Sequence, residues 1–222
     1  MKYSLADRAF LTGCDNNTEW MLDWFMKNYR KHNKTPIVFA NFGVSAEMNA
    51  QLGMMGFDEI INMPIQKGQG WFYKPKAILE ALQLHKEICW LDTDIHILDN
   101  MSGIFEFVKP NKLTMCEDRG WSSRRGEKWH NSGVVACART PSILREWERE
   151  CTNNPQVGDQ EVLHEMVRVS PMTRMTHIED APNIYNWLRL DILDGKDNRS
   201  KKAMHWTGYK GKLHIRKLIY NE

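Results

Sequence analysis

Short hydrophobic runs alternate with stretches of helical spacing along the first half of the chain. The runs have the length and composition of strands and cover residues 8–13, 36–40, 60–63 and 88–91. Between them, hydrophobic side chains recur every three or four positions over residues 18–31, 46–55 and 75–85. Strands separated by helices of this length predict right-handed βαβ units. We therefore expect a parallel sheet with residues 88–91 as its fourth strand.

The second half of the chain has a looser pattern. Residues 112–116 and 133–138 are predicted strands, and the polar stretch between them, residues 117–131, is predicted to be a loop. Helical spacing returns over residues 141–151 and 159–167, before a less regular stretch rich in Asn, Asp and Trp. No internal repeat and no Pro/Gly/Ser linker divides the chain. We therefore expect one α/β domain over residues 1–222.

The composition is that of an ordinary globular protein. Of the 222 residues, 42% are hydrophobic and 26% are charged, which excludes disordered, collagenous and membrane-embedded classes. A formal charge of +2 is too small to predict a nucleic acid as partner. Cations gather only near the end of the chain, and taken alone this basic stretch is expected to be a solvated face. Its members are Lys201, Lys202, Lys210, Lys212, Arg216 and Lys217.

Cysteine usage and hydropathy indicate a cytoplasmic protein. The five cysteines form no C-x-x-C pair and are expected to be reduced and buried. No segment approaches the roughly 18 consecutive apolar residues of a membrane helix, and the first residues contain no secretory hydrophobic region. We therefore expect neither a transmembrane segment nor disulfides.

Two aspartates follow the fourth predicted strand. Asp92 and Asp94 lie one residue apart on an extended segment, so both carboxylates point to the same side and can reach one cation. A hard divalent cation such as Mn²⁺ or Mg²⁺ removes their repulsion and accepts phosphate oxygens at its remaining positions. The alternative is a turn in which the carboxylates cap backbone amides. Ligands of parallel sheets bind beyond the carboxyl ends of the strands, so residues 12–15 are expected on the same rim.

Four motifs occur along the chain in the order KAILEALQLHKEICWLDTD, HNSGVVAC, GDQEVLHEM and HWTGYKGK. Together they resemble the motifs of GT-A glycosyltransferases, most of all the glycogenin-like and bacterial galactosyltransferase-like retaining enzymes. The resemblance covers residues 11–212. It implies a GT-A fold, which is a Rossmann-like, mostly parallel central sheet flanked by helices. It also implies a nucleotide-binding half, residues 1–100, and an acceptor half with a metal- and phosphate-binding tail, residues 101–222.

The resemblance implies a metal site and a first phosphate contact. Asp92, Asp94 and His205 are the implied ligands of Mn²⁺ or Mg²⁺. In the family, a lysine at the start of the helix before the D-x-D strand contacts the donor. Lys76 has a similar spacing here, and Lys74 is the competing candidate.

The rest of the implied donor site lies on the strand-end loops and near the end of the chain. Gly211 stands where the family has a second phosphate-binding lysine, so Lys210 and Lys212 are both candidates for that role. The other residues expected at the donor are Thr12, Gly13, Asp15, Asn41, Thr93, Asn131, Ser132 and Gly208.

Catalysis and acceptor binding are assigned in the same way. The resemblance places Asp159 and Gln160 beside the reacting carbon and implies that the anomeric configuration is retained. Inversion would instead require a carboxylate as general base, a role open to Asp118, Glu117 and Asp159. Because aromatic faces stack on sugars, acceptor contacts are expected from the loop at residues 117–131, through Trp121, Arg124 and Trp129. Trp187 is a further candidate.

The predicted activity is transfer of a hexose from a UDP- or GDP-sugar to a sugar or glycan acceptor. Two alternatives remain. A phosphohydrolase of the haloacid dehalogenase type also ends a strand in D-x-D, with the first aspartate as nucleophile, although usually on its first strand. A binding module for nucleotides or carbohydrates would keep the fold without turnover.

Overall fold

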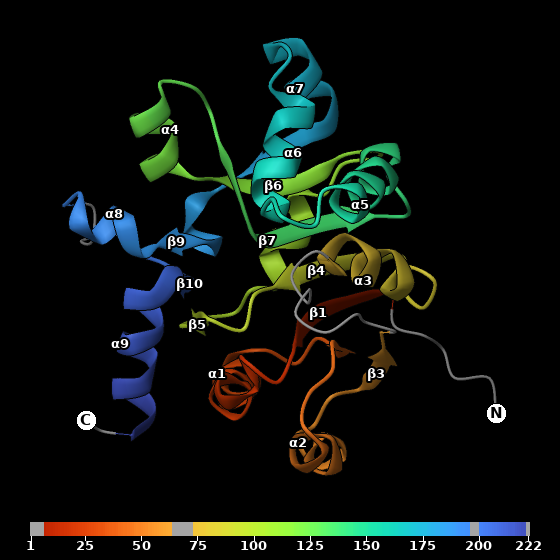
Figure 1. Cartoon of the computed structure of the whole chain (residues 1–222), viewed down its shortest axis with the longest axis vertical. Coiled ribbons are helices and arrows are strands. Elements are labelled where there is room, and N and C mark those ends of the chain that lie inside the picture. The colour runs from red at the N-terminus through yellow and green to blue at the C-terminus, as the bar shows by residue number, and fades with distance from the viewer. Residues whose placement is uncertain (1–6, 64–72, 196–199, 221–222) are drawn as a thin grey trace.

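The computed structural model describes residues 7–63, 73–195 and 200–220 and contains a seven-stranded central sheet (Figure 1). Its strand order is β3-β2-β1-β4-β7-β6-β8. The strands are β1 (Arg8–Cys14), β2 (Ile37–Asn41), β3 (Glu59–Asn62), β4 (Glu87–Leu91), β6 (Leu113–Glu117), β7 (His130–Ala138) and β8 (Ile178–Ala181). Four neighbouring pairs are parallel, and the two pairs that β7 makes are antiparallel. The predicted mostly parallel central sheet is confirmed.

Helices cover both faces of this sheet. The α-helices are α1 (Leu22–His32), α2 (Ala46–Gln51), α3 (Lys74–Ala81), α4 (Arg119–Arg125), α5 (Ser142–Asn153), α6 (Asp159–Val167), α7 (Pro171–His177), α8 (Arg189–Leu193) and α9 (Gly208–Tyr220). Short 3₁₀ helices are η1 (Glu19–Met21), η2 (Leu52–Met54), η4 (Ser102–Phe107) and η5 (Asn183–Tyr185). The helices predicted in residues 1–167 are confirmed with shifted ends, and residues 18–31 divide into η1 and α1.

The two largest hydrophobic clusters among the described residues hold helices against the two faces of the sheet. On one face, Ala77 of α3, Trp147 of α5 and Leu163 of α6 pack with inward side chains of the strands. On the other face, Phe25 of α1 and Phe105 of η4 do the same. Burial of this much apolar surface is the main force that fixes the layers. This packing therefore holds the ends of the strands in fixed positions.

The predicted loop at residues 117–131 is wrong, because the structure has α4 there and β7 already begins at His130. The Asp118 side chain accepts a hydrogen bond from the backbone N–H of Trp121 at 3.0 Å and caps the helix. Gly126 ends it with φ 70°, in the left-handed region that favours glycine. The residues that cap both ends therefore define α4, although its sequence has little of the apolar spacing that is typical of a helix.

A second, smaller sheet brings the end of the chain beside the end of β4. Its order is β5 (Ile95–Ile97), β10 (Ala203–His205) and β9 (Trp187–Leu188). β10 runs antiparallel to β5 with His205 opposite Ile95, and the backbone N–H of Trp206 donates to the carbonyl oxygen of Asp94 at 3.0 Å. The stretch after residue 167, predicted to be less regular, therefore contains regular elements that complete the site. Within the described ranges, no helix is long and apolar enough to cross a bilayer.

Candidate functional site

The carboxyl ends of β1 and β4 meet the beginning of β7 at one edge of the central sheet. β1 is parallel to β4, whereas β7 is antiparallel to it, so residues 130–133 run alongside the segment that follows Leu91. The backbone N–H of Asp92 donates to the carbonyl oxygen of Gly133 at 2.9 Å. The reversal of direction between β4 and β7 therefore places two motif segments side by side.

The two aspartates after β4 face one histidine. One oxygen of Asp92, Oδ1, accepts from the indole N–H of Trp90 at 2.6 Å and lies 3.1 Å from the ammonium of Lys74. Its other oxygen lies 3.8 Å from Nε2 of His205, and Oδ1 of Asp94 lies 3.0 Å from the same nitrogen. Asp92 is thus anchored through one oxygen and presents the other to the histidine.

A buried asparagine orients His205. Nδ1 of His205 lies 3.0 Å from Oδ1 of Asn186, and the Asn186 amide donates to Oδ1 of Asn131 at 2.8 Å. This arrangement places the amide oxygen toward the ring, so Nδ1 carries the proton and Nε2 is directed at the carboxylates. Burial alone would lower the pKa of His205, but the Asp94 carboxylate outweighs it and holds the pKa above its ordinary value.

These side chains fit a divalent cation. One ligand atom from each of Asp92, Asp94 and His205 lies within 4.8 Å of the others. Two carboxylate oxygens and one imidazole nitrogen suit Mn²⁺ or Mg²⁺, and the bond from Asn186 to the second ring nitrogen is the usual support of a ligating histidine. The structure therefore brings together the three residues implied as metal ligands.

We expect Asn186→Ala to weaken Mn²⁺ binding about 10- to 100-fold, because the His205 ring loses the acceptor that fixes its tautomer and orientation. Isothermal titration of the protein with Mn²⁺ measures this affinity. Asn154→Ala is the matched control, since the Asn154 amide only donates to the Glu150 carbonyl at the end of α5. Equal affinities in both variants would contradict the role given to Asn186.

Of the two competing lysines, the structure brings Lys74 to the site. Its buried ammonium lies 2.9 Å from Oδ2 of Asp159 and donates to the carbonyl oxygen of Ser132 at 3.0 Å. Burial would lower the pKa of Lys74, but the carboxylates of Asp159 and Asp92 raise it well above its ordinary value. The Lys76 ammonium instead lies 6.0 Å from the centre of the Tyr73 ring and lines a surface hollow with residues of α5.

Amide side chains connect the second and third motifs. Oε1 of Gln160 accepts from the Asn131 side chain at 2.9 Å and from the Ser132 backbone at 3.2 Å. Nε2 of Gln160 donates to Oδ2 of Asp118 at 3.3 Å, and Asn131 donates to the same oxygen at 3.2 Å. The Asp118 carboxylate is buried, and each of its oxygens already accepts a hydrogen bond from the protein.

Two hollows meet at Asp92 and Asp94, which are called the acidic cluster below. The first has a volume of about 430 Å³ and extends under the β1 loop and Phe42, and the second, of about 260 Å³, extends toward α4, α8 and the start of α9. Both are lined by Asp92, Asp94, Ser132 and Gln160. Two ligands bound in these hollows would therefore meet at the same side chains.

The expected donor residues divide into two groups. Gly13, Asp15, Thr93 and Lys212 line the first hollow, and Gly208 lines the second. The Thr12 hydroxyl instead donates to the carbonyl oxygen of Leu91, and the Asn41 side chain holds its own loop through the backbone of Gly43 and Val44. Among the described residues, neither Thr12 nor Asn41 lines the two hollows.

The fourth motif lacks the family's lysine for a steric reason. A Cβ atom at Gly211 would lie 1.9 Å from the carbonyl oxygen of Trp206, so no side chain fits at this position. Lys210 is exposed, whereas the Lys212 ammonium lies 3.9 Å from Oδ2 of Asp94. Of Lys210 and Lys212, it is therefore Lys212 that the structure brings to the carboxylates.

The expected acceptor tryptophans differ in exposure. Trp121 lines the second hollow and stacks on Trp129, with ring centres 5.6 Å apart. Trp129 is itself buried and stacks on His164 at 3.6 Å. Trp187 is only 1% exposed and lies under the Arg119 guanidinium, 4.5 Å from the ring centre. Arg124 is exposed on α4.

Several residues that line the hollows were not predicted from the sequence. They include Asn17, Phe42, Leu188, Leu190 and Thr207, to which Asn186 adds the contact with His205. Thr207 lies within HWTGYKGK, between the matching His205 and Gly208, and the others lie outside the four motifs. Their spacing contains no signal that could have identified them.

Comparisons with known proteins agree with this geometry. Residues 71–212 match the family described as nucleotide-diphospho-sugar transferase. No curated protein matches the chain. Among solved structures, an active-site mutant of LgtC is 14% identical with a TM-score of 0.65, and the match covers 96% of this chain and 95% of LgtC. Another LgtC structure is described as the galactosyltransferase in complex with donor and acceptor sugar analogues.

Two other solved structures show the same likeness. The glycosyltransferase GlyE of Streptococcus pneumoniae TIGR4 is 16% identical with a TM-score of 0.64, and the match covers 91% of this chain but only 55% of GlyE. A glycosyltransferase involved in glycosylation of the major capsid of PBCV-1 is 13% identical with a TM-score of 0.59, covering 96% of this chain and 98% of that one. At these identities the likeness establishes the fold, which is that of the GT-A glycosyltransferases.

Proposed function

Because this chain belongs to the nucleotide-diphospho-sugar transferase family and is a glycosyltransferase, we propose that it transfers a hexose from a UDP- or GDP-sugar to a sugar or glycan acceptor. The observation that carries this proposal is the convergence of Asp92, Asp94 and His205 where the two hollows meet. Donor and acceptor can then approach the acidic cluster from opposite sides. The proposed division is a nucleotide-binding half, residues 1–100, and an acceptor half, residues 101–222.

The first hollow is the proposed donor site. A divalent ion held by Asp92, Asp94 and His205 would neutralise charge on the diphosphate as the glycosidic bond breaks. Lys212, whose ammonium lies 3.9 Å from Oδ2 of Asp94, adds positive charge in the same hollow. The loop with Gly13 and Asp15 provides the surface for the base and ribose.

The side chains around Gln160 are the proposed site of the reacting carbon. Gln160 is held from two sides by Asn131 and Asp118, which restrains it at the junction of the hollows. The oxygens of Asp118 accept hydrogen bonds, and Asp159 is paired with Lys74. Two of the three carboxylates considered for inversion are thus engaged, and this supports retention, because inversion requires a carboxylate that is free to accept the acceptor's proton.

The second hollow is the proposed acceptor site. Trp121 offers an indole at its wall, and indole faces stack well on the apolar faces of sugars. The burial of Trp129 and Trp187 favours supporting roles for these two rings, with Trp129 beneath Trp121. Arg124 on the same helix remains a candidate contact for a larger acceptor.

A thermal-shift series tests the donor and the metal together. With UDP or GDP and their sugars at about 100 times the dissociation constant, we expect Mn²⁺ to raise the melting temperature by about 5–10 °C. Asp94→Ala should remove this increment, whereas Asp99→Ala, a change at an exposed aspartate paired with Lys202, should keep it. A metal-dependent increment that persists in Asp94→Ala would rule out the proposed site.

Release of free nucleotide from the donor sugar separates catalysis from binding alone. We expect release to require Mn²⁺ and to accelerate with a suitable acceptor. Nucleotide binding without release from any sugar donor would indicate a binding module. Phosphate release from simple phosphoesters would instead support the phosphohydrolase alternative.

A further inference from the structure

The helix α9 has an outer face that combines cations with exposed aromatic and aliphatic side chains. At 100° per residue, an arc of about 120° contains six side chains. These are Tyr209, Lys210, Leu213, Arg216, Lys217 and Tyr220. Tyr209, Leu213 and Tyr220 are 77%, 40% and 56% exposed. The helix contains no Asp or Glu, so its surface charge is wholly positive apart from the helix dipole.

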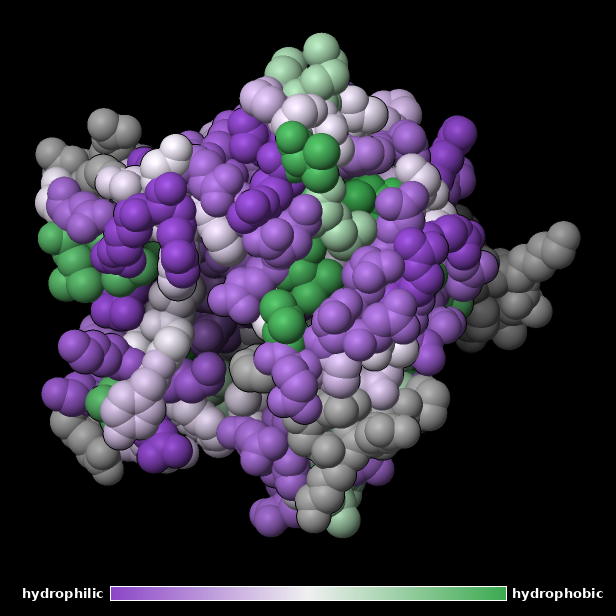
Figure 2. All heavy atoms as spheres, turned by 45° about the horizontal axis from the view of Figure 1, so that its top comes forward, coloured by the Kyte–Doolittle hydropathy of each residue, from purple (hydrophilic) through white to green (hydrophobic). Residues whose placement is uncertain are grey.

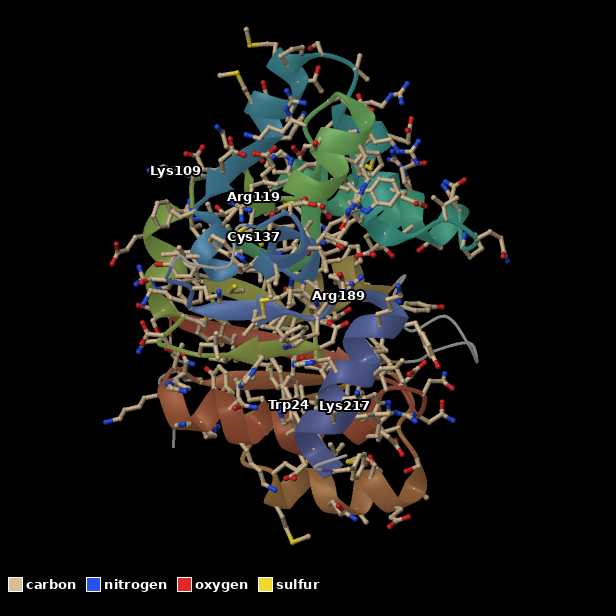
Figure 3. The ribbon with its side chains drawn as sticks, turned by 90° about the vertical axis from the view of Figure 1, so that its left-hand side faces the viewer. Trp24, Lys109, Arg119, Cys137, Arg189 and Lys217 are labelled. Atoms are coloured by element: carbon tan, nitrogen blue, oxygen red, sulfur yellow. The ribbon has the colours of Figure 1, made fainter. Side chains whose placement is uncertain are left out.

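Over residues 211–215, the opposite face of α9 fixes the helix to the protein. Gly211 and Ile215 are buried, and His214 stacks on Trp206 with ring centres 3.7 Å apart. From the edge of the outer arc, the Arg216 guanidinium reaches the Trp20 ring at 4.9 Å. In Figure 1 α9 forms one side of the molecule, and Figure 3 looks onto this helix with Lys217 labelled. The remaining side chains of the outer face are therefore presented outward on a supported helix.

The charge on this outer face differs from that of the whole molecule. Lys210, Arg216 and Lys217 lie together on it, whereas the whole chain carries a formal charge of only +2. The outer face of α9 is therefore a local concentration of positive charge.

We propose that the outer face of α9 binds the surface of a membrane that contains anionic lipids. Tyrosine and leucine side chains enter the headgroup region favourably, and lysine and arginine pair with lipid phosphates beside them. A second copy of the chain fits less well, because a symmetric interface would oppose the same cations. The inference does not depend on the proposed function, although Gly208 of α9 also lines the second hollow and would bring a lipid-linked acceptor close to it.

Co-sedimentation with vesicles tests this proposal. We expect the protein to bind vesicles of phosphatidylcholine mixed with phosphatidylglycerol at least ten-fold more strongly than vesicles of phosphatidylcholine alone, and to be released by salt. Lys210→Gln combined with Lys217→Gln should reduce binding on the order of ten-fold. Tyr209→Ser, Leu213→Ser and Tyr220→Ser together should reduce binding to the mixed vesicles by a similar factor.

A matched control is available on α7, where Met172 and Met175 are 72% and 65% exposed. Figure 2 shows hydrophobic side chains gathered at the top of the molecule, over this helix. Met172→Ser with Met175→Ser should leave vesicle binding unchanged, and circular dichroism should show that every variant is folded. Absence of binding, equal binding to neutral vesicles, or an equal loss in the α7 variant would overturn the proposal. So would stronger binding to soluble heparin than to the anionic vesicles, which would identify a polyanion site instead.

Discussion

Replacing Lys74 with methionine is expected to destabilise the protein by about 3–5 kcal/mol, because two carboxylates lose the buried cation between them. The Lys74 ammonium lies 3.1 Å from Asp92 and 2.9 Å from Asp159, and it also donates to Ser132. Methionine keeps most of the volume and removes only the charge and the donors. Urea unfolding of Lys74→Met against wild type measures this difference in free energy.

A second variant separates stability from catalysis. Adding Asp159→Asn to Lys74→Met removes one of the two orphaned charges and should recover part of the lost stability. Turnover should stay on the order of 100-fold or more below wild type, because the donor site still lacks its cation and the carboxylate of Asp159, expected beside the reacting carbon, is changed as well. Wild-type stability in the single variant would show that the three charges do not interact as the distances indicate.

The second large effect is expected from Gly133→Ala. A Cβ atom there would lie 2.2 Å from Cε1 and 2.6 Å from Nδ1 of His205, and 2.9 Å from Oδ1 of Asn131. The imidazole must move away, which breaks its contact with Asn186 and withdraws Nε2 from the carboxylates. We expect a loss of stability of about 1–3 kcal/mol and Mn²⁺ binding about 100-fold weaker.

Titration with Mn²⁺ and thermal melting of the same samples measure both effects. Gly53→Ala is the matched control, since a Cβ at Gly53 meets nothing within 4 Å. That variant should bind Mn²⁺ as wild type does. If Gly133→Ala bound the ion equally well, His205 would not be a ligand in the position described.

Strands β1, β2 and β4 and helix α1 were predictable because each has a strong apolar signal. β1, β2 and β4 consist almost wholly of buried side chains, and α1 has an apolar stripe that packs on the sheet. Later elements lack this signal. β8 is an edge strand, and its sequence Ile-Glu-Asp-Ala has little apolar pattern. β10 has only three residues. Both strands therefore form because of their pairing with neighbouring strands in the folded chain.

The residues of the candidate site were predictable only where they belong to a motif and their side chains can themselves bind a metal ion or a phosphate. Asp92 and Asp94 follow from local spacing, whereas the pairing with His205 came from the family resemblance. Spacing favoured Lys76, but α3 begins at Lys74, and its first turn directs that side chain to the acids. Asn186 had no local signal, because its role depends on a ring that only the folded chain brings within 3.0 Å.

The small sheet β5-β10-β9 has a consequence for biosynthesis. Its central strand β10 contributes His205, which lies opposite Ile95. The ribosome synthesises the chain from the N-terminus onward. Both aspartates therefore leave the ribosome long before His205 does. The complete three-ligand set cannot therefore form on the unfinished chain, and stabilisation by a metal-bound donor is confined to molecules whose synthesis has passed β10.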